Sequence, residues 1–302
     1  MRLRWLPSAA IVGATIAMVA AARPGSARPG SVVLLTDAAR VTGYAGVTLF
    51  VGTLAFWWLV WPSGRGDRSL TRLAWLGLLL VAVSAPAGLV ATLAGAGPES
   101  AVHLLERPAA PLIARIVICA VAAAWLASYA RQSATGLAVG AVVVFSLALT
   151  IVTARPGEVQ VPAIALAELH VIAAAGWVGG LAALAAALIP RRDPGVLHAT
   201  VGSFSWLSMA CVGTLAVTGT AHALIHAGGL APLMTSAYGA ALLAKLTAVA
   251  GMLGAATGSH EYVRRLRSAA PPPQVIGLFV GAEFAFGAVA LVLTAGLVRV
   301  PG

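Results

Sequence analysis

Charged side chains are scarce in this sequence. Only 9% of its 302 residues are Asp, Glu, Lys or Arg, whereas 60% are hydrophobic. A soluble domain carries charge at about a quarter of its positions, so the composition excludes a soluble globular protein. The short alternating segments of a membrane β-barrel are also missing from the sequence. We therefore expect an all-α, polytopic transmembrane helical bundle of about 8–9 helices, without a soluble domain.

Cysteine, methionine and lysine are also rare. The two cysteines, Cys119 and Cys211, form no CxxC motif, which argues against a disulfide framework. The five methionines form no MxxxM array, so we do not expect a ladder of thioether ligands. A phosphate-binding glycine loop is absent as well, so we do not expect ATP-driven transport. We also expect that the protein is not an enzyme. The net charge of +10 comes almost entirely from arginine in short loops, which indicates membrane topology rather than nucleic-acid binding.

Apolar runs divide the chain into nine expected helices. They cover residues 6–22, 39–61, 73–95, 111–130, 134–154, 162–189, 200–225, 237–258 and 275–298. The first run has a basic start and small residues before Arg23, which also describes a signal peptide. We favour a retained helix, with cleavage as the alternative.

Arginine distribution predicts one orientation. With the N-terminus in the cytoplasm, the inner segments hold Arg2, Arg4, Arg65, Arg68, Arg72, Arg131, Arg191, Arg192, Arg264, Arg265 and Arg267. The outer segments hold only Arg23, Arg28, Arg40, Arg107, Arg155 and Arg299. This bias follows the positive-inside rule.

This orientation gathers candidate metal ligands in the outer half of the bundle. His170 lies about 12 Å below the outer end of its helix, at 1.5 Å per residue. His222 and His226 follow each other by one helical turn near the outer end of the next helix, and Met234 lies in the loop beyond it. Imidazole and thioether groups are good copper ligands, so these four residues are the predicted metal set. Histidines that only bond a neighbouring helix are the alternative.

The stretch AELHVIAAAGWVGGLAAL, residues 167–184, places several unusual residues inside one helix. Glu168 lies about 160° around the helix from His170, so the two are not expected to chelate one ion. Trp177 is seven residues from His170 and is expected on the same stripe. Gly176 and Gly180 form a GxxxG spacing that predicts close helix packing.

Three further charges fall within expected helices. Arg115 is close to a helix end, and we expect it to extend outward to water. Lys245 is about 13 Å deep and Glu283 lies near the middle of the last helix. A charge at the bilayer centre costs about 2.5–3.5 kcal/mol, which favours a Lys245–Glu283 pair. Two separately hydrogen-bonded side chains are the alternative.

Two motifs resemble the copper resistance D (CopD) membrane family. LHVIAAAGWVGG resembles that family's L-H-x(6)-W-x-G-G element and includes Trp177, Gly179 and Gly180. YGAALLAK resembles its Y-G-x-x-L-L-x-K helix and includes Tyr238 and Lys245. The two motifs occur in the family's order within residues 160–270. The expected organisation is an N-terminal helix and outer loop (1–30), further transmembrane helices (31–158) and a CopD-like domain (159–302).

The resemblance implies copper handling at the bacterial plasma membrane, usually uptake. Copper, as Cu⁺ or Cu²⁺, would be the substrate, and no other cofactor is firmly implied. A separate CopC-like extracytoplasmic copper-binding protein is the implied protein partner, beside membrane lipid. His222 and His226 are not part of the recognised motifs, and Glu168 has no assigned role.

Two other functions remain open from the sequence. His170 and His222 on neighbouring helices could be axial ligands of a haem in a membrane redox protein. Alternatively, the polar residues could serve helix packing in a non-transporting assembly factor.

Overall fold

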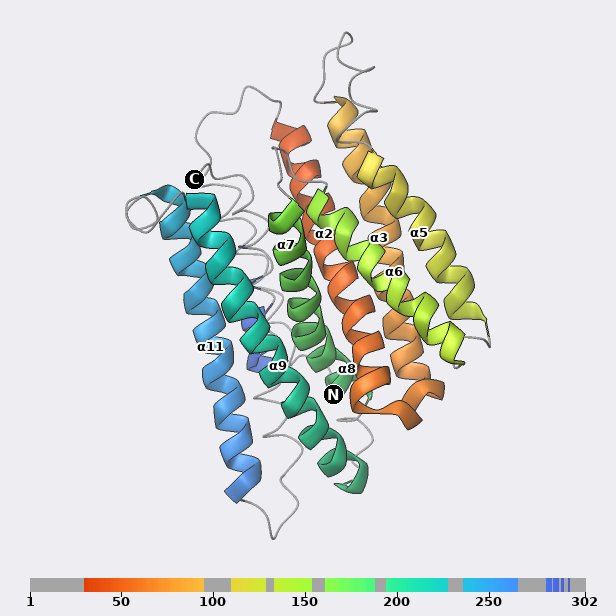
Figure 1. Ribbon diagram of the computed structural model, residues 1–302, viewed down its shortest axis with the longest axis vertical. Coiled ribbons are helices and arrows are strands. Elements are labelled where there is room, and N and C mark those ends of the chain that lie inside the picture. The colour runs from red at the N-terminus through yellow and green to blue at the C-terminus, as the bar shows by residue number, and fades with distance from the viewer. Residues whose placement is uncertain are drawn as a thin grey trace.

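The computed structural model describes residues 30–94, 110–128, 133–153, 161–187, 194–227 and 236–265, and helical residues 281–283, 285–287, 289, 290 and 293. Regular structure in this part of the chain is helical throughout (Figure 1). Seven of its helices are long and apolar enough to cross a membrane. The prediction of an all-α polytopic membrane bundle is confirmed.

The described helices follow seven of the expected segments. In chain order they are α2 (Gly30–Ala55) with its π-helical end η1 (Phe56–Val60), the 3₁₀ turn η2 (Pro62–Gly66), α3 (Arg68–Ala94), α5 (Ala110–Ala127), α6 (Ala134–Thr153), α7 (Val161–Ala174) continued by the π turn η5 (Ala175–Gly179) and α8 (Gly180–Ala187), α9 (Pro194–Ala227) and α11 (Ala237–Arg265). The expected first helix and most of the ninth lie outside the described residues.

Short polar side chains cap the starts of several helices. Asp67 Oδ1 accepts hydrogen bonds from the backbone N–H groups of Ser69 and Leu70, at 2.9 and 3.0 Å, at the start of α3. Ser133 and Ser236 accept a backbone N–H in the same way at the starts of α6 and α11. The first N–H groups of a helix have no partner within it, so these caps fix where the spans begin.

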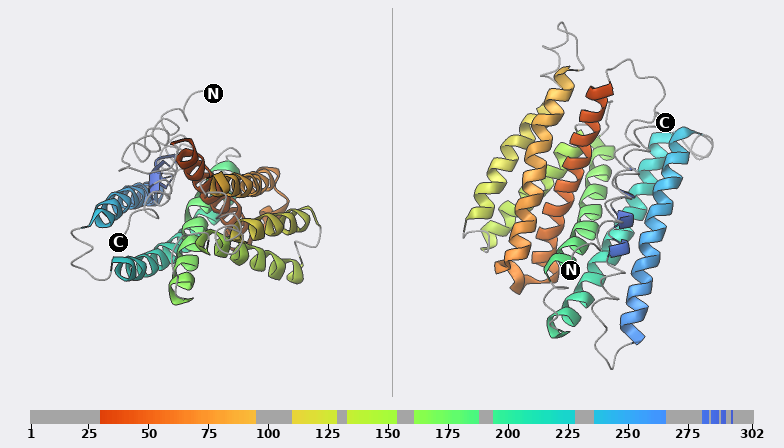
Figure 2. Two further views of the ribbon diagram at one scale, coloured as in Figure 1. Left: turned by 90° about the horizontal axis from the view of Figure 1, so that it is seen from above. Right: turned by 180° about the vertical axis from the view of Figure 1, so that it is seen from behind.

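Helix α2 is the centre of the bundle. Figure 1 places it between α3 and α7, with α5 and α6 on one side and α9 and α11 on the other, and the view from above in Figure 2 agrees. The span containing α2 is 72% buried over its most apolar window, against 17% for the spans of α9 and α11. The large apolar side chains left exposed on the outer helices would face lipid.

Glycines allow α2 to approach its neighbours closely. A Cβ on Gly46 would lie 2.7 Å from the carbonyl oxygen of Gly77 in α3. A Cβ on Gly179 in η5 would overlap the Thr48 carbonyl oxygen of α2, and one on Gly52 would overlap Gly179. Small residues at such crossings let membrane helices gain van der Waals contact between their backbones.

Arg115 corrects an expectation from the sequence. Its side chain does not extend outward but is only 5% exposed. Its Nε and Nη2 donate to the hydroxyl and the carbonyl oxygen of Thr150, at 3.1 and 2.8 Å. Thr150 lies in the last turn of α6, where carbonyl groups lack intrahelical partners and the helix dipole is negative. The prediction of a snorkelling side chain was wrong because it considered only the depth of Arg115 on its own helix.

Candidate functional site

A polar side-chain contact joins two membrane helices in the second half of the chain, where α7 meets α9. We call this contact the α7–α9 seam and define it by His170, Gly176 and Gly180 on one side and Phe204, Cys211, Thr218 and Gly219 on the other. His170 is nine residues from the start of α7 (170 − 161), and Thr218 is nine residues from the end of α9 (227 − 218). Because α7 and α9 run antiparallel, the His170 and Thr218 side chains lie at about the same depth.

His170 is held against α9 by one hydrogen bond and one close packing contact. Its Nδ1 lies 3.0 Å from the Thr218 Oγ1. The same hydroxyl lies 2.6 Å from the backbone carbonyl oxygen of Thr214 and donates to it. A Cβ on Gly219 would lie 3.1 Å from Cε1 of the imidazole ring. The half-buried ring thus lies on the backbone of α9 rather than facing lipid.

The expected glycine packing surface is present in the seam. A Cβ on Gly176 would lie 3.2 Å from the Cys211 sulfur, and one on Gly180 would lie 2.8 Å from the Phe204 ring. Both glycines therefore pack against α9, which confirms the prediction from their GxxxG spacing. Trp177 is buried, at 3% exposure. The π turn beginning at Ala175 interrupts the regular period from which its alignment with His170 was predicted.

The other predicted metal ligands are placed only in part. His222 is half-buried and lies one turn beyond Thr218 on α9. The backbone of His226 continues α9, but its side chain, like the whole of Met234, lies outside the described residues. Among the residues that the structure describes, no group of three or more His, Cys, Asp or Glu side chains could hold a metal ion. The four-residue metal set stays a prediction.

Glu168 is half-buried on α7, two residues before His170. That the pair does not chelate one ion stays a prediction from the helical angle between them. Its role stays unassigned.

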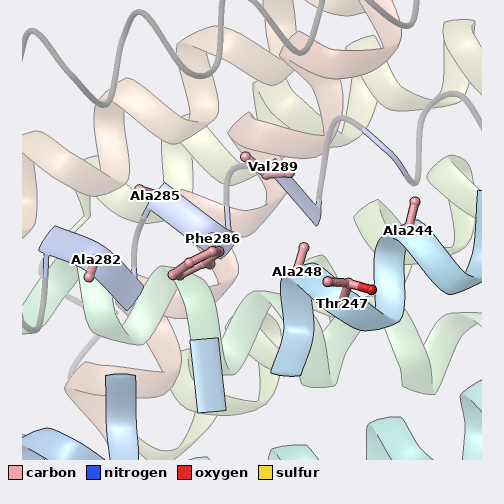
Figure 3. A pocket seen from close by; sticks show the side chains of 7 residues that line it. All are labelled: Ala244, Thr247, Ala248, Ala282, Ala285, Phe286 and Val289. Atoms are coloured by element: carbon pink, nitrogen blue, oxygen red, sulfur yellow. The ribbon is translucent and has the colours of Figure 1, made fainter. Parts of the chain in front are cut away.

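Lys245 and Glu283 lie on segments that are neighbours in space. An apolar pocket of about 430 Å³ lies between α11 and the last described helical residues. Figure 3 shows the side chains that line it: Ala244, Thr247, Ala248, Ala282, Ala285, Phe286 and Val289. Glu283 is 4% exposed and Lys245 is half-buried, and each makes a polar or electrostatic interaction. Their mutual pairing stays a prediction. Tyr238, the other residue of this motif, is buried near the start of α11.

Two seam residues on α9, Cys211 and Thr218, were not predicted as site residues. Together with the predicted ligand His222 they follow each other at spacings of seven and four, which places them on one helical face. That spacing was available in the sequence, but each residue type is ordinary in a membrane helix when taken alone. Only the contacts to Gly176 and His170 distinguish this face from the lipid-facing one.

Comparison with protein families gives a match in a segment that includes most of α9. Residues 198–297 match the family model described as copper resistance protein D (CopD). The CopD match covers a third of the chain and includes Thr218, His222, Tyr238, Lys245 and Glu283. His170 and the glycine motif precede it, so the seam joins the CopD-matching segment to the helix before it. Curated proteins and solved structures give no match.

These observations define what kind of molecule this is. It is a multi-pass helical membrane protein with a segment matching the copper resistance family. The predicted domain boundary at residue 159 stays a prediction, because the match begins 39 residues later (198 − 159).

Proposed function

We propose that this protein moves copper across the bacterial plasma membrane, from the outer side inward, and is not an enzyme. His222, His226 and Met234 would collect the ion at the outer end of α9 and α11, and His170 would receive it deeper in the bundle. A separate CopC-like protein would deliver copper from outside. The observation that carries the proposal is the contact of His170 with Thr218, because it joins an intramembrane imidazole to the segment that matches the CopD family.

The position of His170 supports an intramembrane role. Ionisable side chains in the hydrocarbon region are rare and commonly face substrate pathways. A neutral imidazole is also a good ligand for copper in both common oxidation states. The histidine spacing along α9 gives successive imidazoles one turn apart, close enough for an ion to pass between them.

The packing of the seam favours an ion over a haem between His170 and His222. A haem would need to lie between its two axial imidazoles. The His170 ring instead lies directly against Gly219 and bonds Thr218, so these contacts with α9 are not made across a macrocycle.

Copper accumulation in cells tests the proposal. We expect His170→Ala to lower copper uptake at least tenfold at equal expression, because the deep imidazole ligand is lost. His260→Ala is the matched control, since this residue lies near the predicted inner end of α11, and it should retain wild-type uptake. Metal analysis of purified wild type and of the His170/His222/His226 triple alanine variant gives the binding stoichiometry.

Two outcomes would overturn the proposal. Equal accumulation in wild-type and His170→Ala cells would remove His170 from the pathway. Unchanged copper content and tolerance in a deletion strain would instead favour an assembly factor, and a Soret band in the purified protein would favour haem.

A further inference from the structure

A second hydrogen bond of Thr218 determines whether its hydroxyl donates to His170 or accepts from it. Its Oγ1 lies 2.6 Å from the carbonyl oxygen of Thr214, one turn back on α9. Two oxygens at this distance require a proton between them, and the carbonyl has none to give. The single hydroxyl proton of Thr218 is therefore used within its own helix. Toward His170, the hydroxyl can act only as an acceptor.

This assigns the proton on the imidazole ring. Nδ1 of His170 lies 3.0 Å from an oxygen that can only accept, so Nδ1 must carry the hydrogen. In a neutral imidazole with a protonated Nδ1, the lone pair is on Nε2. The tautomer follows from the hydrogen-bond network of the seam.

The same arrangement occurs elsewhere in the bundle with an unambiguous donor. Thr150 Oγ1 donates to the Leu147 carbonyl oxygen at 2.8 Å and accepts from Arg115 Nε at 3.1 Å. A guanidinium group can only donate, so Thr150 must accept from it. Thr218 has a similar pair of distances, 2.6 Å to the Thr214 carbonyl oxygen and 3.0 Å to a ring nitrogen on a neighbouring helix.

We propose that Thr218 is a positioning residue that holds His170 as the Nδ1–H tautomer and so presents Nε2 as the nitrogen that binds copper. This inference rests on the proposed function for the identity of the ligand. Metal-binding histidines are commonly oriented by an acceptor on their other nitrogen, and losing that acceptor weakens metal binding about 10–100-fold. Gly219 also helps to position the ring, because a Cβ at this residue would lie 3.1 Å from Cε1 of His170.

Nuclear magnetic resonance of the metal-free protein tests the assignment directly. Nitrogen-15-labelled histidine distinguishes a protonated from an unprotonated ring nitrogen, and the His170 signals are identified by their loss in His170→Ala. We expect one tautomer, with Nδ1 protonated, in the wild type. Thr218→Val, which keeps the side-chain shape but removes the hydroxyl, should give a mixture or the opposite tautomer. Thr218→Ser should restore the wild-type spectrum.

Thr214→Val is the matched control. It lies on the same helix, its hydroxyl donates to the Ala210 carbonyl oxygen of that helix, and its backbone carbonyl remains available to Thr218. The His170 spectrum should be unchanged in this variant. Circular dichroism and thermal melting establish that each variant is folded, and Gly219→Ala gives a second perturbation of the ring that leaves the Thr218 hydroxyl intact.

Copper titration of the same proteins separates the two proposals. We expect Thr218→Val to raise the Cu⁺ dissociation constant about 10–100-fold and Thr218→Ser to restore it. A folded Thr218→Val protein with the wild-type tautomer would overturn the positioning role. A wild type that has the expected tautomer but binds no copper would overturn the proposed function and leave the role of Thr218 in setting the tautomer established.

Discussion

Two threonines each bond a basic side chain of a neighbouring helix in the described bundle. Thr150 bonds Arg115 and Thr218 bonds His170, and in each pair the threonine hydroxyl also bonds its own helix backbone. In hydrocarbon, a polar side chain without a partner costs several kcal/mol. Each threonine therefore satisfies a group on a neighbouring helix without leaving its own hydroxyl proton unpaired.

Replacing Arg115 tests the contact with α6. We expect Arg115→Lys to destabilise the protein by about 1–3 kcal/mol, because a single ammonium cannot reproduce the fork of N–H donors at Thr150. Thermal unfolding of the detergent-solubilised protein measures the effect. Arg72→Lys is the control, since Arg72 is exposed on α3. Equal midpoints for the two variants would contradict a structural role for Arg115.

At the residue scale, the sequence predicted which polar groups are unusual but not their partners. The depth of His170 follows from counting along its helix, and its burial in the bundle agrees with that count. The burial of Arg115 did not follow, because the compensating carbonyl belongs to another helix. Partners across helices depend on the rotation and crossing angle of each helix, which the pattern of residues along a single helix does not determine.

At the scale of helices, glycine decides how closely the spans approach. Gly52 and Gly179 meet where α2 crosses η5, and Gly176 and Gly180 lie against α9. One helical segment therefore uses neighbouring glycines to pack against two different helices. Its GWVGG motif has a structural explanation that does not require any of these glycines to contact a substrate.

An added methyl group at this crossing should be poorly tolerated. Gly179→Ala would place a Cβ against the Thr48 carbonyl oxygen and the Gly52 Cα, which are backbone atoms that cannot rotate away. We expect a loss of at least about 1–3 kcal/mol of stability, measured by thermal unfolding and by the yield of monodisperse protein.

Gly213→Ala provides the comparison for this variant. No heavy atom lies within 4 Å of a Cβ at Gly213 among the described contacts, and alanine favours helix over glycine by about 1 kcal/mol. Gly213→Ala should therefore be neutral or slightly stabilising. If both variants unfolded at the same temperature, close approach at the α2–η5 crossing would not limit stability.

The helices themselves were predictable, whereas their irregularities were not. Hydrophobic length placed seven spans correctly, because a bilayer fixes how many apolar residues a helix needs. The π turns η1 and η5 have no such signal, since a π turn forms when packing on several sides requires one extra residue. Such packing depends on the neighbours and not on the local sequence.

For the whole molecule, the arginine bias predicts which end of the bundle faces the cytoplasm. Ser63 lies in η2, at the end assigned to the inside, and Ala110 starts α5 at the other end; both are exposed. The native cysteines are only 5% and 7% exposed, so their background reactivity should be small.

Cysteine labelling of intact cells measures this orientation. A membrane-impermeant maleimide should label Ala110→Cys without treatment and Ser63→Cys only after permeabilisation, because only one end of the bundle is accessible from outside. The parent protein with its two native cysteines is the control. Labelling of Ser63→Cys in intact cells would reverse the orientation and place the proposed histidine entrance in the cytoplasm.

The π turn at Ala175–Gly179 has a consequence for the helical phase of this span. A π turn contains one residue more than regular α-helix would use over the same rise, so it delays the rotation of everything that follows by about 100°. Winding the same residues as regular α-helix, with none removed, would leave His170 in place but rotate α8 by that amount, and Gly180 would turn away from Phe204. The extra residue thus changes the helical phase between the turn of His170 and the turn of Gly180, both of which contact α9.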